Sequence, residues 1–274
     1  MYSWLRIIRP INALMGFVAT YISALVGIGL NIIHSNFLIL STLAGICVFL
    51  VISAGNMIND ISDADTDRIN HPERPIPKGE IRIRDAWIVS IVFFTIASVI
   101  AGISLSLTAG IVVLAAITVL VGYEMRMKGT GLPGNFAISV LVGMIFIFGG
   151  IAVNSVSRMI LLFLMAFLTN SAREIIKDVQ DMKGDLNRKT FPMQHGVKAS
   201  FYLVVALTLS GIVFSLLTYF LGIFGLVYLV AVIVADAIFI ASLVVFSKSA
   251  KESQNFSKLA MILGLVAFTV GGVV

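Results

Sequence analysis

The chain has 274 residues, of which 59% are hydrophobic and only 12% are charged. A soluble globular domain does not need so apolar a composition, so we predict a polytopic membrane protein. Basic loops on one side of a membrane explain the net charge of +5 better than a nucleic-acid partner does. The single cysteine, Cys47, lies inside an apolar run, which excludes an intrachain disulfide and indicates packing.

Apolar segments long enough to cross a bilayer recur along the chain with short connections. At about 20 residues per crossing, the sequence predicts an all-α protein with nine transmembrane helices in a single domain covering residues 1–274. The predicted spans are 11–30, 37–60, 84–105, 107–124, 133–153, 157–178, 200–220, 222–246 and 258–274. The residues before the first span do not have the pattern of a cleavable signal peptide.

The charges between these spans predict their orientation. All 19 Lys and Arg residues except Arg158 fall on one side. Because basic loops stay in the cytoplasm, we predict a cytoplasmic N-terminus and an outer C-terminus in the cell membrane. The acids lie on the same side except Asp236, which is deep in a span and is either functional or hydrogen-bonded to a neighbouring helix. We therefore expect the chemistry at the cytoplasmic face.

The stretch from Asn56 to Gly79 concentrates acid at the end of the second span. Four polar residues follow the spacing i, i+4, i+7, i+11, which predicts one face of a helix that continues past the membrane surface: Asn56, Asp60, Asp63 and Asp67. Asn59 and Asp65 fall off this face. Cationic residues follow directly at Arg68, Arg74 and Lys78.

A second acidic stretch repeats this spacing at the end of the sixth span, at Glu174, Asp178, Asp181 and Asp185, with Arg173 and Lys177 beside it. Four spans separate the stretches, so their helices are parallel and we expect one shared site. Close carboxylates repel one another and lose solvation, so they need cations. Oxygen ligands without clustered Cys or His indicate a hard ion, Mg²⁺ or Mn²⁺, and the basic residues suit a phosphate group. The alternative interpretation is ordinary loop charges paired with each other.

These motifs resemble those of a known family. NDISDADTD at 59–67 resembles the Asn-Asp-x-x-Asp-x-x-x-Asp motif of UbiA-type intramembrane prenyltransferases, and DVQDMKGD at 178–185 resembles their second acidic motif. HPERPIPKG at 71–79 is similar to their Arg-Pro-(Ile/Leu)-Pro loop. The nine-helix count agrees, and within the family the chain is most like archaeal digeranylgeranylglyceryl phosphate synthases. In one departure, Tyr123 and Lys128 are one residue further apart than the family's Tyr-x-x-x-Lys.

The resemblance implies Mg²⁺-dependent transfer of a geranylgeranyl group from its diphosphate to the hydroxyl of geranylgeranylglyceryl phosphate in archaeal ether-lipid synthesis. It implies that six catalytic aspartates hold the metal: Asp60, Asp63, Asp67, Asp178, Asp181 and Asp185. It implies substrate-binding roles for Asn56, Asn59, Arg68, Arg74, Lys78, Tyr123, Lys128, Arg173 and Lys177. Asn12, where the first span starts, is a candidate for substrate contact or a simple helix cap. The implied partners are an isoprenoid diphosphate, a lipid-phosphate acceptor and membrane lipids, with no obligatory protein partner.

Two alternatives stay open at this point. The first is a UbiA-type enzyme with an aromatic, quinone-precursor acceptor or a chlorophyll-like one. The second is a secondary transporter or cation channel. Transporters concentrate ionisable groups near the bilayer midplane, whereas this sequence places only Asp236 there, so the transporter hypothesis is the weaker one.

Overall fold

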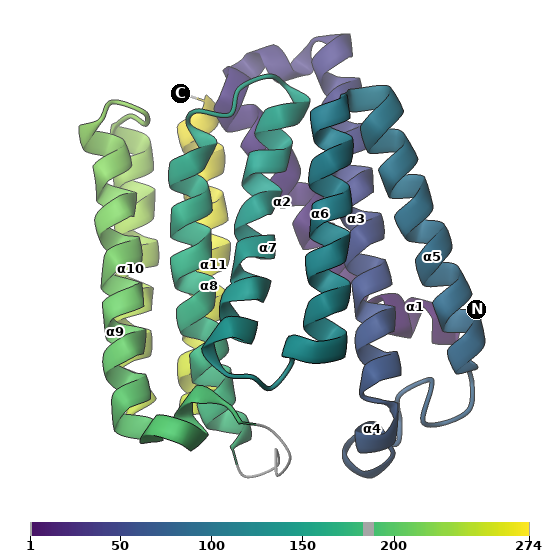
Figure 1. Cartoon of the computed structure of the whole chain (residues 1–274). Helices are drawn as coiled ribbons and strands as arrows, with labels where there is room; N and C mark the ends of the chain where they lie inside the picture. The colour runs from purple at the N-terminus through teal and green to yellow at the C-terminus, as the bar shows by residue number, and fades with distance from the viewer. Residues whose placement is uncertain (1, 183–188, 274) are drawn as a thin grey trace.

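The computed structural model describes residues 2–182 and 189–273, and every regular element within these ranges is helical (Figure 1). In chain order the helices are α1 (Tyr2–Ile8), α2 (Pro10–Ile28), η1 (Gly29–Ile33), α3 (Ser35–Ser62), α4 (Ala64–Asn70), α5 (Ile83–Val99), η2 (Ile100–Leu105), α6 (Leu107–Gly122), η3 (Tyr123–Met127), α7 (Leu132–Ala152), α8 (Met159–Asp181), α9 (Phe191–Phe220), α10 (Leu226–Phe246) and α11 (Ala250–Val273). The prediction of an all-α protein is confirmed.

Nine segments of the described chain are long and apolar enough to cross a membrane. They correspond one for one to the predicted spans, so the predicted count is confirmed. The largest boundary shifts are at α9, which begins at Phe191, and α11, which begins at Ala250. Both starts carry polar residues that hydropathy excludes from a span. Helix α11 continues beyond its apolar stretch, whereas α9 has a kink at Gly196, whose φ of 83° and ψ of 163° are not helical.

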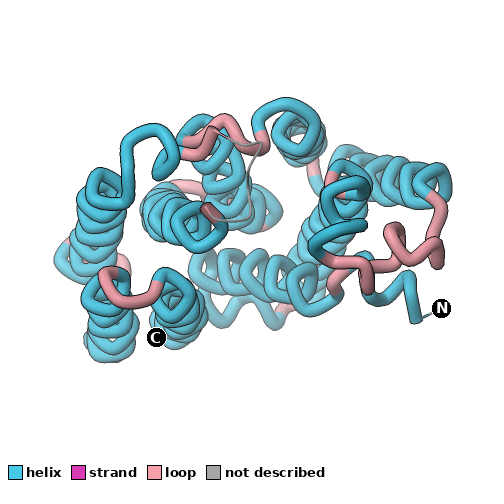
Figure 2. Tube along the Cα trace, turned by 90° about the horizontal axis from the view of Figure 1, so that it is seen from below, coloured by secondary structure: helices cyan, strands magenta, loops and turns pink. Residues whose placement is uncertain are grey.

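The helices stand side by side and pack mainly against their sequence neighbours. Seen end-on in Figure 2, the α9–α10 pair lies at one edge and α1 lies at the other. Helix α2 packs against α3, α7 and α11, so it connects the first helices of the bundle to the last. Small residues permit these approaches. A Cβ atom on Gly149 of α7, for example, would meet the backbone of Thr20 on α2 at 2.5 Å.

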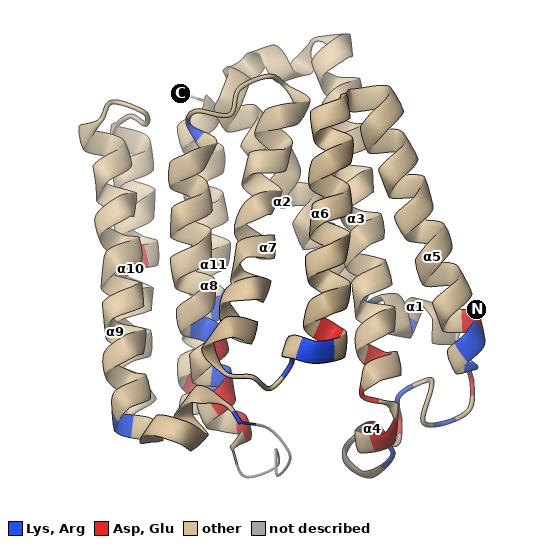
Figure 3. Ribbon diagram, in the orientation of Figure 1, with Lys and Arg blue, Asp and Glu red and all other residues tan. Residues whose placement is uncertain are grey.

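Charged residues gather at one end of the bundle, here called the charged end (Figure 3). Arg158 precedes α8 at the opposite end. Tyr2 lies toward the charged end, and Val273 lies at the opposite one (Figure 1). The predicted one-sided distribution of charge is therefore confirmed. Asp236 lies on α10 away from this end, buried, and Ser215 Oγ of α9 donates to its Oδ2 at 2.7 Å. Of the two readings of Asp236, the structure supports a hydrogen bond between neighbouring helices.

The helix predicted to continue from Asn56 through Asp67 is interrupted, and this correction matters for the site. Helix α3 ends at Ser62, Asp63 leaves helical geometry at φ −91° and ψ 2°, and α4 begins at Ala64. Short polar side chains compete with helical hydrogen bonding and favour helix ends. Three aspartates on one helical face would also repel one another. The break directs Asp63 and Asp67 toward different partners.

Candidate active site

A cavity of about 350 Å³ lies between α3, α6, α7 and α8. Its mouth, at the charged end, is lined by polar and charged side chains: Arg9, Asn56, Asn59, Tyr123, Glu124, Glu174 and Lys177. Its interior is apolar and extends along α3 as far as Cys47, with Val113 of α6 and Phe148 of α7 on other walls. Twelve residues separate Asn59 from Cys47, which is about 18 Å of helix. The cavity is thus a long apolar pocket with a charged opening.

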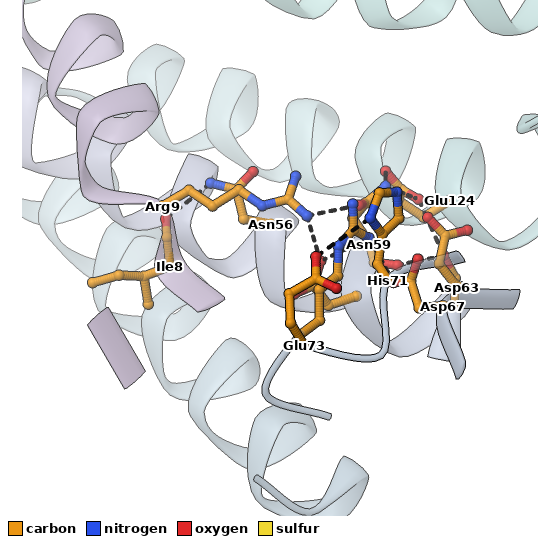
Figure 4. A network of polar contacts seen from close by, with 12 residues as sticks. Ile8, Arg9, Asn56, Asn59, Asp63, Asp67, His71, Glu73 and Glu124 are labelled. Carbon is orange, nitrogen blue, oxygen red and sulfur yellow. Dashed lines mark hydrogen bonds and ion pairs between the residues drawn. The ribbon is translucent and has the colours of Figure 1, made fainter. Parts of the chain in front are cut away.

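The first acidic stretch forms a buried ion network at this mouth. Asp60 is only 2% exposed, and Arg9 Nη2 donates to its Oδ1. The same Arg9 atom lies 3.4 Å from Asn59 Oδ1 (Figure 4). Arg74 Nη1 lies 2.5 Å from Asp67 Oδ2 and 3.7 Å from Asp60 Oδ1. Asp60 and Asp67 therefore share Arg74, so the structure brings these two predicted residues together with a basic partner.

Arg9 was missed as a site residue by sequence reasoning, which counted it only among the basic loop residues. Its backbone lies in the left-handed region, at φ 49° and ψ 66°, directly before Pro10 at the start of α2. This conformation is uncommon for a residue with a side chain and costs of order 1–3 kcal/mol. Packing around the site must therefore hold it in place. The sequence feature that could have indicated Arg9 is an arginine immediately before the proline that starts a span.

Glu124 is the second residue that sequence reasoning missed. It is buried, and Asn59 Nδ2 donates to both of its carboxylate oxygens at 3.1 Å. Lys128 Nζ lies 3.1 Å from Glu124 Oε2 and 2.7 Å from Asp63 Oδ2. Asn59, which falls off the predicted helical face, thus lies between Arg9 and Glu124 (Figure 4). The sequence feature that could have indicated Glu124 is a single acidic residue at the end of an apolar span.

The extra residue between Tyr123 and Lys128 is absorbed by a π-helical turn. Element η3 covers Tyr123–Met127, and Lys128 N donates to Tyr123 O at 2.8 Å, an i to i+5 bond. A π turn accommodates one residue more than an α turn, and such turns are frequent at functional sites. Tyr123 lines the cavity, and Lys128 contacts the acids at its mouth. The departure from the family spacing is therefore compensated by the backbone.

The second acidic stretch reaches the same mouth from α8. Asn135 Nδ2 of α7 donates to Asp178 Oδ2 at 2.8 Å, a partner that the sequence did not indicate. Glu174 lies 2.6 Å from Arg173 Nη1 and 3.8 Å from Lys177 Nζ. Asp181, at the last position of α8, is half-buried. Asp185 lies outside the described residues.

Three predicted substrate-binding residues are not brought to the cavity. Asn12 is exposed in the first turn of α2. Arg68 pairs on the surface with Asp65, whose side chain is 93% exposed. Lys78 lies 2.6 Å from Glu80, and this hydrogen bond lowers the pKa of the Glu80 carboxyl. Asn56 does line the mouth, while its Nδ2 donates to Ile8 O at 2.9 Å.

The donor atoms at the mouth fit a hard divalent cation. They are carboxylate and amide oxygens on α3, α4 and α8, the ligands that Mg²⁺ prefers. Among the residues that the structure describes, no three Asp, Glu, His or Cys side chains converge on one point. The carboxylates of the first stretch are instead neutralised by Arg9, Arg74 and Lys128. These ion pairs offset the cost of burying the carboxylates when no metal ion is bound.

Comparisons with known proteins agree with this geometry. The model of the UbiA prenyltransferase family matches residues 17–266. A digeranylgeranylglyceryl phosphate synthase from Methanosphaera stadtmanae is 36% identical over 99% of each chain. A solved structure of digeranylgeranylglyceryl phosphate synthase has a TM-score of 0.83 at 33% identity, covering 99% of this chain and 98% of that one. A UbiA homologue from Archaeoglobus fulgidus, bound to DMAPP and Mg²⁺, shares the fold with a TM-score of 0.67 at 17% identity, over 98% and 99% of the two chains. The chain therefore belongs to the UbiA prenyltransferase family and is an intramembrane prenyltransferase.

Proposed function

We propose that this enzyme transfers a geranylgeranyl group from geranylgeranyl diphosphate to the hydroxyl of geranylgeranylglyceryl phosphate. The observation that carries the proposal is the apolar cavity, about 18 Å deep along α3, with acids and cations at its mouth. A long isoprenoid fits the apolar walls, and a diphosphate fits the charged opening. A relative that is 36% identical over 99% of its length is named digeranylgeranylglyceryl phosphate synthase.

The proposal assigns the metal to the carboxylates on both sides of the mouth. Asp60, Asp63 and Asp67 would hold it from one side, and Asp178 and Asp181 from the other, a proposal supported by the donor chemistry and by the Mg²⁺ complex of the Archaeoglobus fulgidus homologue. Asp185, outside the described residues, belongs to the same proposed set. Bound Mg²⁺ neutralises the negative charge that develops on a departing diphosphate.

The chain's own cations complete the diphosphate site. Arg9, Arg74 and Lys128 each pair with a carboxylate of the first acidic stretch. When a metal ion takes over these carboxylates, the N–H groups of the three cations become available to diphosphate oxygens. The bond from C1 of the prenyl group to the diphosphate oxygen breaks, and the diphosphate keeps the electron pair. The apolar walls exclude water from the allylic cation. The acceptor oxygen then bonds to C1, and its proton passes to the diphosphate or to an aspartate.

The proposal places the charged end in the cytoplasm and treats the chain as one prenyltransferase domain. All cationic residues except Arg158 belong to this side by the predicted spans, and the positive-inside rule assigns such a side to the cytoplasm. Water-soluble products such as diphosphate are then released into the cytoplasm.

A product assay tests the proposal directly. Purified protein with Mg²⁺ and labelled geranylgeranyl diphosphate is offered geranylgeranylglyceryl phosphate, 4-hydroxybenzoate or a chlorophyll-like acceptor. We expect chelator-sensitive prenyl transfer to the glyceryl phosphate only. Transfer to an aromatic or chlorophyll-like acceptor, with none to the glyceryl phosphate, would overturn the substrate assignment while leaving the enzyme class intact.

A further inference from the structure

A second group of cations lies on α8 and α11, and the donor site described above does not use it. Helices α8 and α11 pack against each other and run in opposite directions (Figure 1). Arg173 lies eight residues before the end of α8, and Lys258 lies eight residues after the start of α11. Both are therefore about 12 Å from the charged ends of their helices. Lys177 lies one turn closer to that end.

Two of these cations share one carboxylate. Glu174 Oε1 lies 2.6 Å from Arg173 Nη1, and Glu174 Oε2 lies 3.8 Å from Lys177 Nζ. Lys258 adds a third positive charge at the same level of the neighbouring helix α11. Three positive groups and one carboxylate leave an excess charge of +2 toward the charged ends of α8 and α11. Like charges this close disfavour one another, so this cluster favours an anionic ligand.

The cluster connects the cavity with the outer surface of the bundle. Glu174 and Lys177 line the mouth, and Lys258 is exposed. Across the mouth, the donor-side cations Arg9 and Lys128 contact the first acidic stretch. A ligand held by the α8–α11 cations therefore has its charged group near the surface and can extend an uncharged part into the cavity. An amphiphile with a terminal phosphate has this form.

We propose that Arg173, Lys177 and Lys258 form a separate subsite for the phosphate monoester of the acceptor lipid. This inference rests on the proposed function and adds to it a distinct phosphate site and the residue Lys258. A phosphate monoester carries about −1.5 to −2 charges at pH 7, which matches the excess of +2, whereas a phosphodiester headgroup carries only one. The planar guanidinium of Arg173 can bind two phosphate oxygens, and the lysines act as point charges.

A substitution with a matched control tests this subsite. We expect K258Q to raise the KM for geranylgeranylglyceryl phosphate about 10- to 100-fold, the effect of one lost charge-assisted hydrogen bond. The KM for geranylgeranyl diphosphate should not move. K258R, which keeps the charge, should restore most of the affinity. K251Q removes an exposed cation two turns earlier on the same helix and should leave both KM values unchanged.

A phosphate-free acceptor, geranylgeranylglycerol, provides the specific readout. The wild-type enzyme should prefer the phosphorylated acceptor, and K258Q should lose much of that preference. An unchanged preference ratio would overturn the subsite, and a rise in the donor KM instead would assign the cluster to the diphosphate. If wild-type protein makes no product from either acceptor, the proposed function itself fails, which is a distinguishable result.

Protection of the wild-type protein gives a measurement that needs no variant. An amine-reactive reagent should label both Lys251 and Lys258, as read by mass spectrometry of peptides. We expect the phosphorylated acceptor to protect Lys258 but not Lys251, and the phosphate-free acceptor to protect neither. Equal protection by an anionic phosphodiester lipid would show a general lipid headgroup site and would contradict the acceptor assignment.

Discussion

Asp60→Asn separates the chemistry of the site from the stability of the fold. Asp60 is 2% exposed and is shared by Arg9 and Arg74. Breaking a fully buried ion pair costs about 3–5 kcal/mol. The two arginine side chains are, however, 32% and 27% exposed, so water screens them and the expected cost falls to roughly 1–2 kcal/mol. The variant should therefore fold, with an unfolding temperature only a few degrees lower.

Its activity should fall far more. Removing one preorganised group that stabilises transition-state charge costs roughly 100- to 1000-fold in kcat, and we expect at least this loss for a metal ligand. Asp65→Asn is the control, because Asp65 belongs to the same stretch but is exposed and pairs with Arg68 on the surface. Labelled-product assays across a Mg²⁺ titration measure both variants. Activity of Asp60→Asn within tenfold of wild type, or an equal loss in Asp65→Asn, would refute the metal-site assignment.

Three further predictions test the cavity, the π turn and the metal. Val113→Phe narrows the inner cavity and should lower kcat/KM for a C20 prenyl diphosphate more than for a C10 one. Leu114→Phe is the control: Leu114 is 56% exposed, so neither kcat/KM value should change. Equal effects of Val113→Phe on both donors would contradict the cavity as the prenyl site. Deleting Met125, which is 64% exposed, should convert the π turn into an α turn and return Tyr123 and Lys128 to the family spacing. The KM for the prenyl diphosphate should then stay within a few-fold of wild type. A large rise in this KM would show that binding depends on the π turn itself. EDTA should abolish turnover, and it should abolish the binding of the prenyl diphosphate measured by calorimetry. The protein should stay folded by circular dichroism, because Arg9, Arg74 and Lys128 already neutralise the first acidic stretch. Binding of the prenyl diphosphate without metal would argue against the metal-site assignment.

Parts of the site could be predicted because they depend on local pattern. The repeated acidic spacing identified Asp60, Asp67 and Asp178, and the structure gives each a polar partner, Arg74 for the first two and Asn135 for the third. Arg9 and Glu124 could not be found in this way. Each is a single charged residue at the end of a span, and its role depends on what packs opposite it. Arg68 and Lys78 show the reverse case, since both lie near the motif in sequence but turn to surface partners.

The sequence by itself determined the membrane class, the nine spans, the clustering of charge at one end and the family. These features depend on helix length, hydropathy and the cost of placing charge in lipid, all of which are properties of local composition. The tertiary structure decided which charges meet. It broke the helix at Asp63, absorbed the extra residue before Lys128 in a π turn, and packed α11, which carries Lys258, against α8, which carries Arg173, 85 positions away in the chain. Contacts of this kind depend on how helices pack, because residues distant in the chain become neighbours only when the bundle is assembled.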